Sequence, residues 1–442
     1  MKQIFFIIIL WYSVIPICAQ NNDSLQIVIA DLEGRLETLQ YTELVQSMSQ
    51  RSLLIPGYFE DIKALVAVQA YNFWIQNTDE KFVSHKNVYS ALHYGNKYLT
   101  LDSSTNLAYN QIKGHEAQVV AIEFGKDGNT FYSAGSDGRI LKWNMSNLEL
   151  PPTLVYEGRE LYRSIELSHD GDLLLVCTRD HGVMLINLNS TQSLNASEIS
   201  TVNISRDEEV AQAAMFVPNE LKYVSITKDG KVKMKGYGLD STTAQTQEKV
   251  RVMSIDPNNK DIYAGTNRGV VQIWDVDFKE RYLEMPELYA VNALAISSDE
   301  RYLAIGREKG DAVIWDMQEK KYVRTISGHE SAITDLDFSP DDNLLLTASR
   351  DKTVRVWDLH NPKKLPLVLD DHEGWVLTAC FDQTGGKVLS GSMDNLIRVW
   401  PLAPKTLADD ICKNLNRNMT PEEWANYVGH GITYQETCVT SQ

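Results

Sequence analysis

The sequence predicts a mainly β protein whose largest part is a seven-bladed β-propeller. Three observations support this fold class: similar segments recur along the chain, their spacing is even, and each contains a strand, a turn and a second strand. Four segments almost overlay, GVVQIWDV, GDAVIWDM, KTVRVWDL and NLIRVWPL, which end at Val276, Met317, Leu359 and Leu402. A fifth segment, GRILKWNM, ends at Met145.

Two degenerate segments complete the set of repeats. GVMLINLN has Asn187 where the others have tryptophan, and GKVKMKGY has Lys235. The tryptophan-equivalent positions are then 143, 187, 235, 274, 315, 357 and 400. Their spacing is close to the roughly 40–45 residues of one four-stranded blade. Within one repeat, residues 341–358 alternate between apolar and polar before a tight turn and a second apolar run. Seven such units predict a closed ring.

These residues resemble the WD-repeat family. In the sixth unit Gly328 and His329 open the repeat, Asp351 lies in the turn and Trp357 closes it. The resemblance implies a hydrogen-bonded set of His, Ser or Thr, Asp and Trp inside a blade, and thus a structural role. The set maps onto His329, Ser349 (or Thr347), Asp351 and Trp357, and in the seventh unit onto His372, Ser392, Asp394 and Trp400.

The two ends of the repeat region predict how the ring closes. After Trp400 the chain continues Pro-Leu-Ala-Pro, which offers no fourth strand for the last blade. The segment 105–112 alternates in polarity and has no partner strand of its own. We expect it to complete the last blade, so that no sheet edge stays open. The propeller is therefore expected over residues 105–402.

Helices are expected on both sides of the propeller. In residues 20–104, apolar side chains recur at helical spacing from Leu25 to Leu39, from Ile62 to Trp74 and around Val88 to Tyr94. This subdomain is either a cap packed on the propeller or a docking helix or short coiled coil for a partner. In residues 403–442, Thr420 and Pro421 with a Glu three residues after Thr420 mark a helix start.

The C-terminal segment also resembles a tail that follows bacterial propellers of the WD-repeat family. The similarity lies in a Cys, the stretch Asn-Arg-Asn-Met-Thr, Glu-Trp, a Tyr and a final Cys. Cys412 and Cys438 bracket the segment, and such a pair is a good disulfide candidate in an oxidising compartment.

The first 19 residues predict export. Lys2 precedes an apolar run from Ile4 to Ile17, and Ala19 is a small residue suited to cleavage. The alternatives are an uncleaved anchor and a lipoprotein attached through Cys18. A periplasmic or secreted protein of a Gram-negative bacterium is expected. The formal charge of −17 disfavours nucleic acid and anionic membranes as partners.

No catalytic, cofactor or metal-binding motif is found in the sequence, so we expect a non-enzymatic binding protein without cofactor or metal. The family resemblance implies a partner face at the turns that carry Gly-His and Asp. Large side chains placed there by register are Tyr162, Arg163, Tyr289, Arg350, Trp375 and Met393. The leading hypothesis is a scaffold for a cell-envelope protein. The alternatives are a hydrolase or lyase on envelope carbohydrate or peptide, marked by a metal or paired carboxylates at the ring axis, and a ligand sensor that signals through the N-terminal helices.

Overall fold

The computed structural model describes residues 22–76, 86–101, 109–189, 204–206, 210–227, 230–236, 243–246, 248–256, 258, 260–275, 279–283 and 288–438. The expected signal peptide, residues 1–19, lies outside these ranges, and so does Cys18. The chain divides into two compact units, a propeller over residues 100–406 and a helical unit that combines residues 87–99 with both ends of the chain. In the part of the chain that the structure describes, no helix is both long and apolar enough to cross a membrane.

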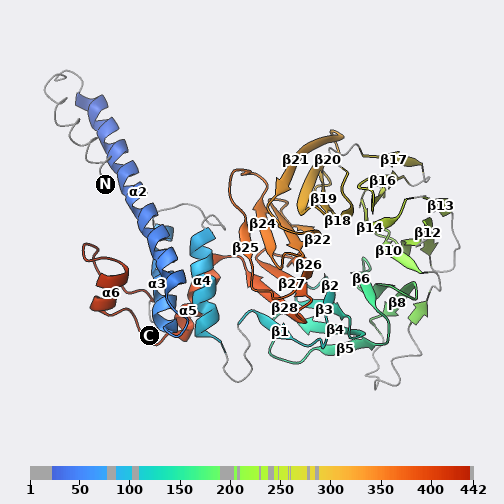
Figure 1. Ribbon diagram of the computed structural model, residues 1–442, viewed down its shortest axis with the longest axis horizontal. Coiled ribbons are helices and arrows are strands. Elements are labelled where there is room, and N and C mark those ends of the chain that lie inside the picture. Colours follow the sequence, from blue (N-terminus) through green and yellow to red (C-terminus); the bar gives the residue numbers. More distant parts are fainter. Residues whose placement is uncertain are drawn as a thin grey trace. The chain divides into compact units, whose positions relative to one another are not determined.

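The propeller consists of seven four-stranded antiparallel sheets, as the sequence predicts (Figure 1). Blade 1 contains β2 (Val119–Phe124), β3 (Thr130–Gly135), β4 (Arg139–Asn144) and β5 (Thr153–Glu157). Blade 2 contains β6 (Tyr162–Leu167), β7 (Leu173–Thr178), β8 (Val183–Asn187) and β9 (Ile204–Arg206). Blade 3 contains β10 (Ala211–Phe216), β11 (Lys222–Thr227), β12 (Lys231–Gly236) and β13 (Thr243–Gln245). Blade 4 contains β14 (Val250–Ile255), β15 (Ile262–Thr266), β16 (Val271–Trp274) and β17 (Glu280–Tyr282).

The remaining blades follow the same plan. Blade 5 contains β18 (Val291–Ile296), β19 (Tyr302–Arg307), β20 (Asp311–Asp316) and β21 (Lys321–Ser327). Blade 6 contains β22 (Ile333–Phe338), β23 (Leu344–Ser349), β24 (Val354–Asp358) and β25 (Leu367–Leu369). Blade 7 contains β26 (Val376–Phe381), β27 (Lys387–Ser392), β28 (Leu396–Pro401) and β1 (Gln111–Lys113).

Packing between blades explains why the second strand of each blade is so apolar. In β23, the run Leu-Leu-Leu-Thr-Ala-Ser is buried from its second residue onward, and the second strands of the other blades are buried in the same way. A strand covered on both faces needs apolar or small residues at every position. The tight turn that follows often needs glycine, as at Gly138, whose φ is +80° and where a Cβ would lie 2.1 Å from the Gly158 oxygen.

The ring closes as expected. β1 pairs with β28, with Gln111 opposite Arg398 and Lys113 opposite Leu396. An N-terminal strand therefore completes the last blade, and β26 packs beside β2. Of the expected strand, residues 105–108 lie outside the described ranges.

The register of blade 2 corrects one assignment made from the sequence. Leu174 on β7 pairs with Ile186, at the place where Val388 on β27 pairs with Trp400. Ile186, and not Asn187, therefore occupies the tryptophan position. Ile186 is buried, whereas Asn187 is exposed and accepts a hydrogen bond from the Asn189 backbone N–H. An apolar side chain thus replaces the indole, and it stands one residue before the position that the repeat pattern indicates.

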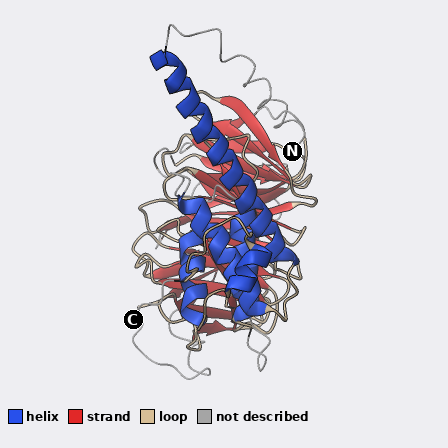
Figure 2. Ribbon diagram, turned by 90° about the vertical axis from the view of Figure 1, so that its left-hand side faces the viewer, coloured by secondary structure: helices blue, strands red, loops and turns tan. Residues whose placement is uncertain are grey.

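The helical unit joins the two ends of the chain. α2 (Asn22–Leu54), α3 (Glu60–Gln76) and α4 (Lys86–Leu99) precede the propeller, and α5 (Pro404–Asn414) and α6 (Pro421–Tyr427) follow it. Figure 2 shows these helices in blue. The Phe73 and Trp424 rings lie 6.1 Å apart, and the Asn72 side chain donates to the Thr437 carbonyl at 2.8 Å. The two flanks, expected as separate segments 20–104 and 403–442, thus pack as one unit.

The C-terminal segment contains both features expected from its sequence. Cys412 and Cys438 form a disulfide with a Cα–Cα distance of 5.4 Å. The Thr420 hydroxyl accepts a hydrogen bond from the Glu423 backbone N–H, and the Glu423 carboxylate accepts one from the Thr420 N–H. This capping box begins α6 where the sequence predicts a helix start. Helix α5 is an element that sequence reasoning missed.

Candidate functional site

Three blades contain the hydrogen-bonded set that the resemblance implies. In blade 6, His329 Nδ1 lies 2.8 Å from Asp351, and its Nε2 lies 2.6 Å from the Thr347 hydroxyl. The Trp357 indole N–H donates to the same hydroxyl at 2.9 Å. Burial opposes ionisation of Asp351, but hydrogen bonding and charge at His329 outweigh it and hold the pKa of this carboxyl well below its usual range. These residues stabilise the blade.

Blades 7 and 1 contain the same arrangement. In blade 7 the Ser390 hydroxyl lies 2.8 Å from both His372 Nε2 and Trp400 Nε1, and His372 Nδ1 lies 2.8 Å from Asp394. In blade 1 the corresponding residues are His115, Ser133, Asp137 and Trp143.

The hydroxyl is the member of the set that the sequence left open in blade 6 and misplaced in blade 7. In blade 6 the structure uses Thr347, the alternative to Ser349, and in blade 7 it uses Ser390 instead of Ser392. Residues two apart on a strand face the same way but lie roughly 6–7 Å apart, so only one can reach both rings. Ser349 and Ser392 instead accept the backbone N–H groups of Asp351 and Asp394.

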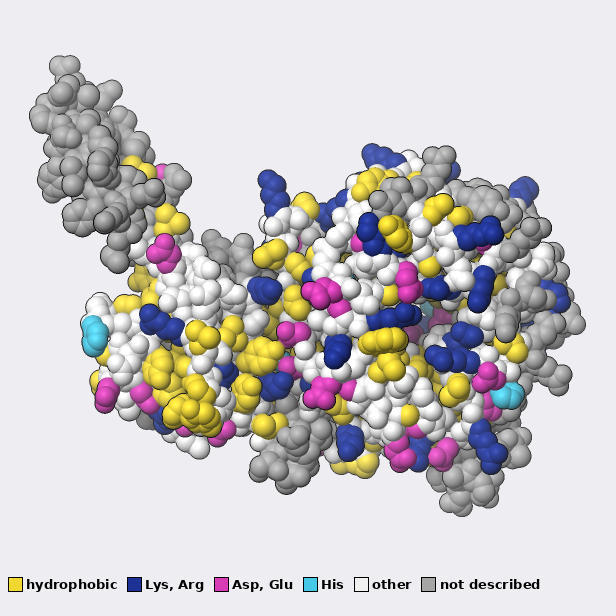
Figure 3. Space-filling model, viewed as in Figure 1, with side chains coloured by type: hydrophobic (Ala, Val, Ile, Leu, Met, Phe, Trp, Pro, Cys, Tyr) yellow, Lys and Arg dark blue, Asp and Glu magenta, His cyan; other side chains and the backbone are white. Residues whose placement is uncertain are grey.

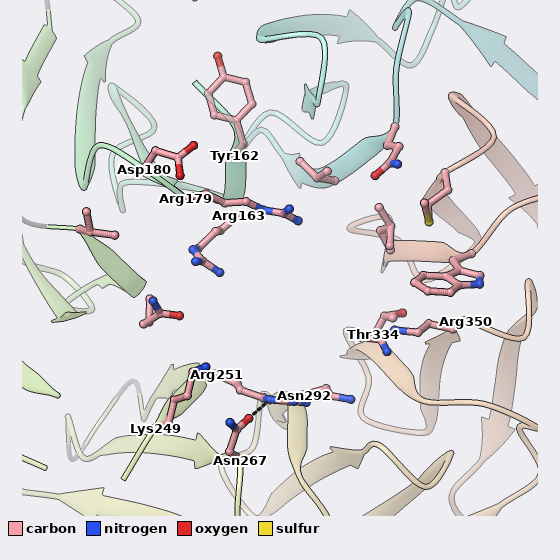
Figure 4. A pocket seen from close by; sticks show the side chains of 17 residues that line it. Tyr162, Arg163, Arg179, Asp180, Lys249, Arg251, Asn267, Asn292, Thr334 and Arg350 are labelled. Carbon is pink, nitrogen blue, oxygen red and sulfur yellow. Dashed lines mark hydrogen bonds between the residues drawn. The ribbon is translucent and has the colours of Figure 1, made fainter. Parts of the chain in front are cut away.

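A pocket of about 1000 Å³ opens in the propeller near its axis (Figure 4). Five of the six side chains expected on a partner face line it: Tyr162, Arg163, Arg350, Trp375 and Met393. Tyr289 lies outside the lining, 39% exposed, with the cationic groups of Arg307 and Lys309 within 5.5 Å and 4.9 Å of its ring. The structure therefore gathers most of the predicted residues into a single pocket.

Two of these residues, Arg350 and Trp375, form a partly exposed cation–π pair, and a third, Tyr162, is almost fully buried. The Arg350 guanidinium lies 5.1 Å from the centre of the Trp375 ring, which is 45% exposed. Tyr162 is only 1% exposed, and its hydroxyl donates to the Gly138 carbonyl at 2.7 Å. The side chain of Tyr162 is therefore used inside the propeller, and little of its surface is available to a partner.

The innermost strands contribute a ring of side chains that sequence reasoning missed. Each innermost strand has a register shift after its first paired residue, which leaves one residue unpaired per blade. β-Bulges of this kind redirect a side chain. The seven unpaired residues, which we call the bulge ring, line both the pocket and a channel that continues from it: Val120, Arg163, Gln212, Arg251, Asn292, Thr334 and Leu377.

The pocket is strongly cationic. Asp180 is the single acidic side chain in the lining. Five basic side chains line the pocket, namely Arg163, Arg179, Lys249, Arg251 and Arg350. Figure 3 shows Lys and Arg around a hollow in the propeller. Glu308 bridges Arg251 and Arg350 at 2.9 and 3.2 Å, and its hydrogen bond with Asn292, together with these arginines, lowers the pKa of its carboxyl. Among the residues that the structure describes, the other three cations have no acidic partner.

The channel beyond the bulge ring has a volume of about 630 Å³ and is lined by four carboxyl groups, those of Glu123, Glu166, Asp335 and Asp337. Each accepts a backbone N–H from the next blade, for example from Phe216 to Glu166 at 2.9 Å and from Phe381 to Asp337 at 2.8 Å.

Burial dominates the ionisation of these groups. It raises the pKa values of Glu123 and Glu166 to about 8, that of Asp337 to about 7 and that of Asp335 to about 6. These carboxyl groups link neighbouring blades. In the described ranges no cluster of His, Cys, Asp and Glu is arranged to hold a metal ion.

Comparisons with known proteins agree with the architecture. The family "WD domain, G-beta repeat" matches residues 108–144, 320–358 and 363–401. The Drosophila melanogaster protein LST8 homolog is 38% identical over 116 residues, 24% of this chain and 37% of that protein. Nuclear distribution protein PAC1 of Candida tropicalis is 30% identical over 147 residues, 32% of this chain and 30% of that protein. The Drosophila protein groucho is 28% identical over 185 residues, 39% of this chain and 24% of that protein.

The chain thus spans less than two fifths of the length of each of these relatives. The matched repeats fall in blades 1, 5, 6 and 7, and the same four-stranded unit recurs in the other blades. Three blades also contain the His, hydroxyl, Asp and Trp set. By its three matched repeats and its seven four-stranded sheets, this chain is a seven-bladed β-propeller that contains WD repeats.

Proposed function

We propose that this chain is an exported, non-enzymatic scaffold that binds a protein of the cell envelope on the pocket side of its propeller. The observation that carries the proposal is the cation–π pair Arg350 and Trp375 at the pocket, beside the partly exposed Met393. Arg and Trp are the residue types that dominate binding energy at protein interfaces. A rigid ring holds them in place without loss of order on binding.

Export is proposed on two features of the chain. The first 19 residues have the composition of a signal peptide. The Cys412–Cys438 disulfide also fits an oxidising compartment, such as the bacterial periplasm or the extracellular space.

The proposal can be tested by affinity capture of the full chain from its native envelope after mild cross-linking, read by quantitative mass spectrometry. The double variant Trp375→Ala/Arg350→Ala should lose a stoichiometric protein partner that the wild type retains. Tyr322→Ala is the matched control, because it removes an aromatic side chain of similar exposure (43%) from the outer strand β21. Equal recovery of the partner by the double variant would refute binding at this face.

A second candidate is a hydrolase or lyase that acts on envelope carbohydrate or peptide, and the axial carboxyl groups are the observation that favours it. Two acids with different pKa values are the usual requirement of such chemistry. However, the hydrogen bonds from neighbouring blades account for all four groups without catalysis. Turnover of an envelope polymer that Glu166→Gln abolishes without loss of fold would favour the enzyme. A small molecule that raises the melting temperature would favour the ligand sensor.

A further inference from the structure

We infer that the pocket recognises an acidic peptide segment of the partner, with an apolar side chain next to the acidic ones. The inference rests on the proposed function and names the chemistry of the partner. It depends on the charge of the pocket, on an unsatisfied arginine within it, and on the division of its lining into a cationic and an apolar wall.

The charge of the pocket is opposite to that of the protein. The whole chain has a formal charge of −17, whereas five cationic side chains and one carboxylate line the pocket. Like charges gathered at one place repel one another and reduce stability unless an anion offsets them. Glu308 neutralises part of this charge at Arg251 and Arg350. Arg163, Arg179 and Lys249 keep their charge for a ligand, and Figure 4 shows these side chains around the open middle of the pocket.

Arg163 provides a second and independent indication of a ligand. It occupies the bulge position of β6, so its side chain is redirected to the neck of the pocket. Its Nε atom is buried and has no hydrogen-bond partner in the structure. A buried donor without an acceptor is costly, and a turn of the side chain toward the pocket would let this Nε join the terminal guanidinium nitrogens in binding a carboxylate.

The two walls of the pocket define the order of groups in the ligand. Blades 7 and 1 contribute apolar side chains, namely Trp375, Leu377 and Val120, with Met393 beside them. Blades 2 and 4 contribute the cations Arg163, Arg179, Lys249 and Arg251, and blade 3 contributes Val210 and Gln212 between them. A ligand that spans the opening therefore meets an apolar wall on one side and a cationic wall on the other.

A peptide fits this lining better than a small apolar molecule. Small-molecule sites are mostly apolar with a few polar groups, whereas charged and amide side chains form most of this lining. The volume of about 1000 Å³ also accommodates several side chains. Acidic residues would pair with the guanidinium groups, which bind carboxylates in a bidentate manner.

The test uses the full chain and a fluorescein-labelled peptide in which glutamates flank a leucine–phenylalanine pair, followed by fluorescence anisotropy. A second peptide carries glutamine in place of every glutamate. We expect the acidic peptide to bind about tenfold or more tightly than the glutamine peptide. Its affinity should also fall as salt is raised, because the attraction is electrostatic.

The decisive variant is Arg163→Gln/Lys249→Gln, which breaks no ion pair among the described residues. It should weaken binding of the acidic peptide about tenfold or more. Lys126→Gln/Lys363→Gln is the matched control, because both side chains are exposed, neither lines the pocket and neither forms an ion pair among the described residues, yet the change in net charge is the same. This control should bind as the wild type does. Thermal melting of each variant establishes that the propeller is folded.

Three results would overturn the inference. The acidic and glutamine peptides could bind equally, Arg163→Gln/Lys249→Gln could bind as tightly as the control, or inorganic polyphosphate could bind where the acidic peptide does not. Failure of this inference can be distinguished from failure of the proposed function. If the captured partner is lost in Trp375→Ala/Arg350→Ala but kept in Arg163→Gln/Lys249→Gln, the scaffold stands and the acidic segment does not.

Discussion

At the scale of single residues, blade 7 depends on one hydroxyl, that of Ser390, which forms hydrogen bonds with both a histidine and a tryptophan ring. Ser390 accepts the Trp400 indole N–H and pairs with His372 Nε2, and all three residues are buried. Burial lowers the pKa of His372, which favours the neutral ring and leaves one ring nitrogen to pair with Asp394 and the other with Ser390. Removal of the hydroxyl would leave two buried polar groups without partners.

Ser390→Ala should therefore lower the free energy of unfolding by about 2–4 kcal/mol, because each unsatisfied group costs roughly 1–3 kcal/mol. Ser392→Ala is the control on the same strand. Its hydroxyl accepts a single backbone N–H, from Asp394, so a loss of about 1 kcal/mol is expected. Urea denaturation of both variants measures the difference, and an equal loss would contradict the role given to Ser390.

The residues that the sequence placed correctly and incorrectly in this set differ for a physical reason. His372, Asp394 and Trp400 stand at turn and strand-end positions where no similar residue competes. The hydroxyl has two candidates, Ser390 and Ser392, on the same face of β27, and only the reach of the two rings distinguishes them. Reach is a property of the folded blade and has no signal in a single sequence.

At the scale of elements, polarity patterns predicted which segments are strands and helices but not how the innermost strands aim their side chains. Alternation of apolar and polar residues predicts which face of a strand each side chain lies on, because every second side chain points the same way. A single-residue bulge shifts this pattern by one residue. Arg163 and Arg251 reach the pocket because each is the bulged residue of its strand. The repeated segments predicted the blades, whereas the residues of the bulge ring can be identified only from the strand register of the folded blades.

A buried lysine organises the corner between α2 and α3. Lys63 is 2% exposed, and its ammonium group donates to the carbonyls of Ser52, Leu53 and Ile55 at 2.8, 3.1 and 3.0 Å. The last carbonyls of a helix lack partners within it, and a cation there also interacts favourably with the helix dipole. Burial lowers the pKa of Lys63, so the three carbonyls must offset a real desolvation cost.

Lys63→Met keeps the length of the side chain and removes the donor. The expected loss in the free energy of unfolding is about 2–3 kcal/mol, because three carbonyls lose their partner while the cost of burying a charge disappears. Amides of residues 50–60 should also exchange faster with deuterium. Lys413→Met, at an exposed lysine of α5 that pairs with Asp410, should cost no more than about 0.5 kcal/mol and leave the exchange of residues 50–60 unchanged. Unchanged exchange in Lys63→Met would show that the corner does not depend on the ammonium group.

At the scale of the whole molecule, the propeller separates its charges along the axis. Cations surround the pocket, the bulge ring marks the neck, and carboxyl groups line the channel beyond it. Each carboxyl group links two blades, yet burial favours its neutral form. Ring closure by β1 holds these groups together, so their ionisation acts on the stability of the whole propeller.

The stability of the propeller should consequently depend on pH through Glu166. Its folded pKa of about 8 lies above its ordinary value of 4.5, because of burial and of the neighbouring Glu123. Between these values the folded state binds more protons than the unfolded state, so the free energy of unfolding falls as pH rises. The buried His372 acts in the opposite sense below its ordinary pKa, and a comparison between variants at each pH removes this contribution.

Glu166→Gln cannot ionise, but it retains an oxygen that can accept the Phe216 N–H. The variant should raise the melting temperature more at about pH 8 than at about pH 5, where Glu166 is already protonated in the folded state. Glu149→Gln, at an exposed carboxylate, supplies the control. If both variants shift the melting temperature equally at both pH values, the ionisation of Glu166 is not the source of the pH dependence.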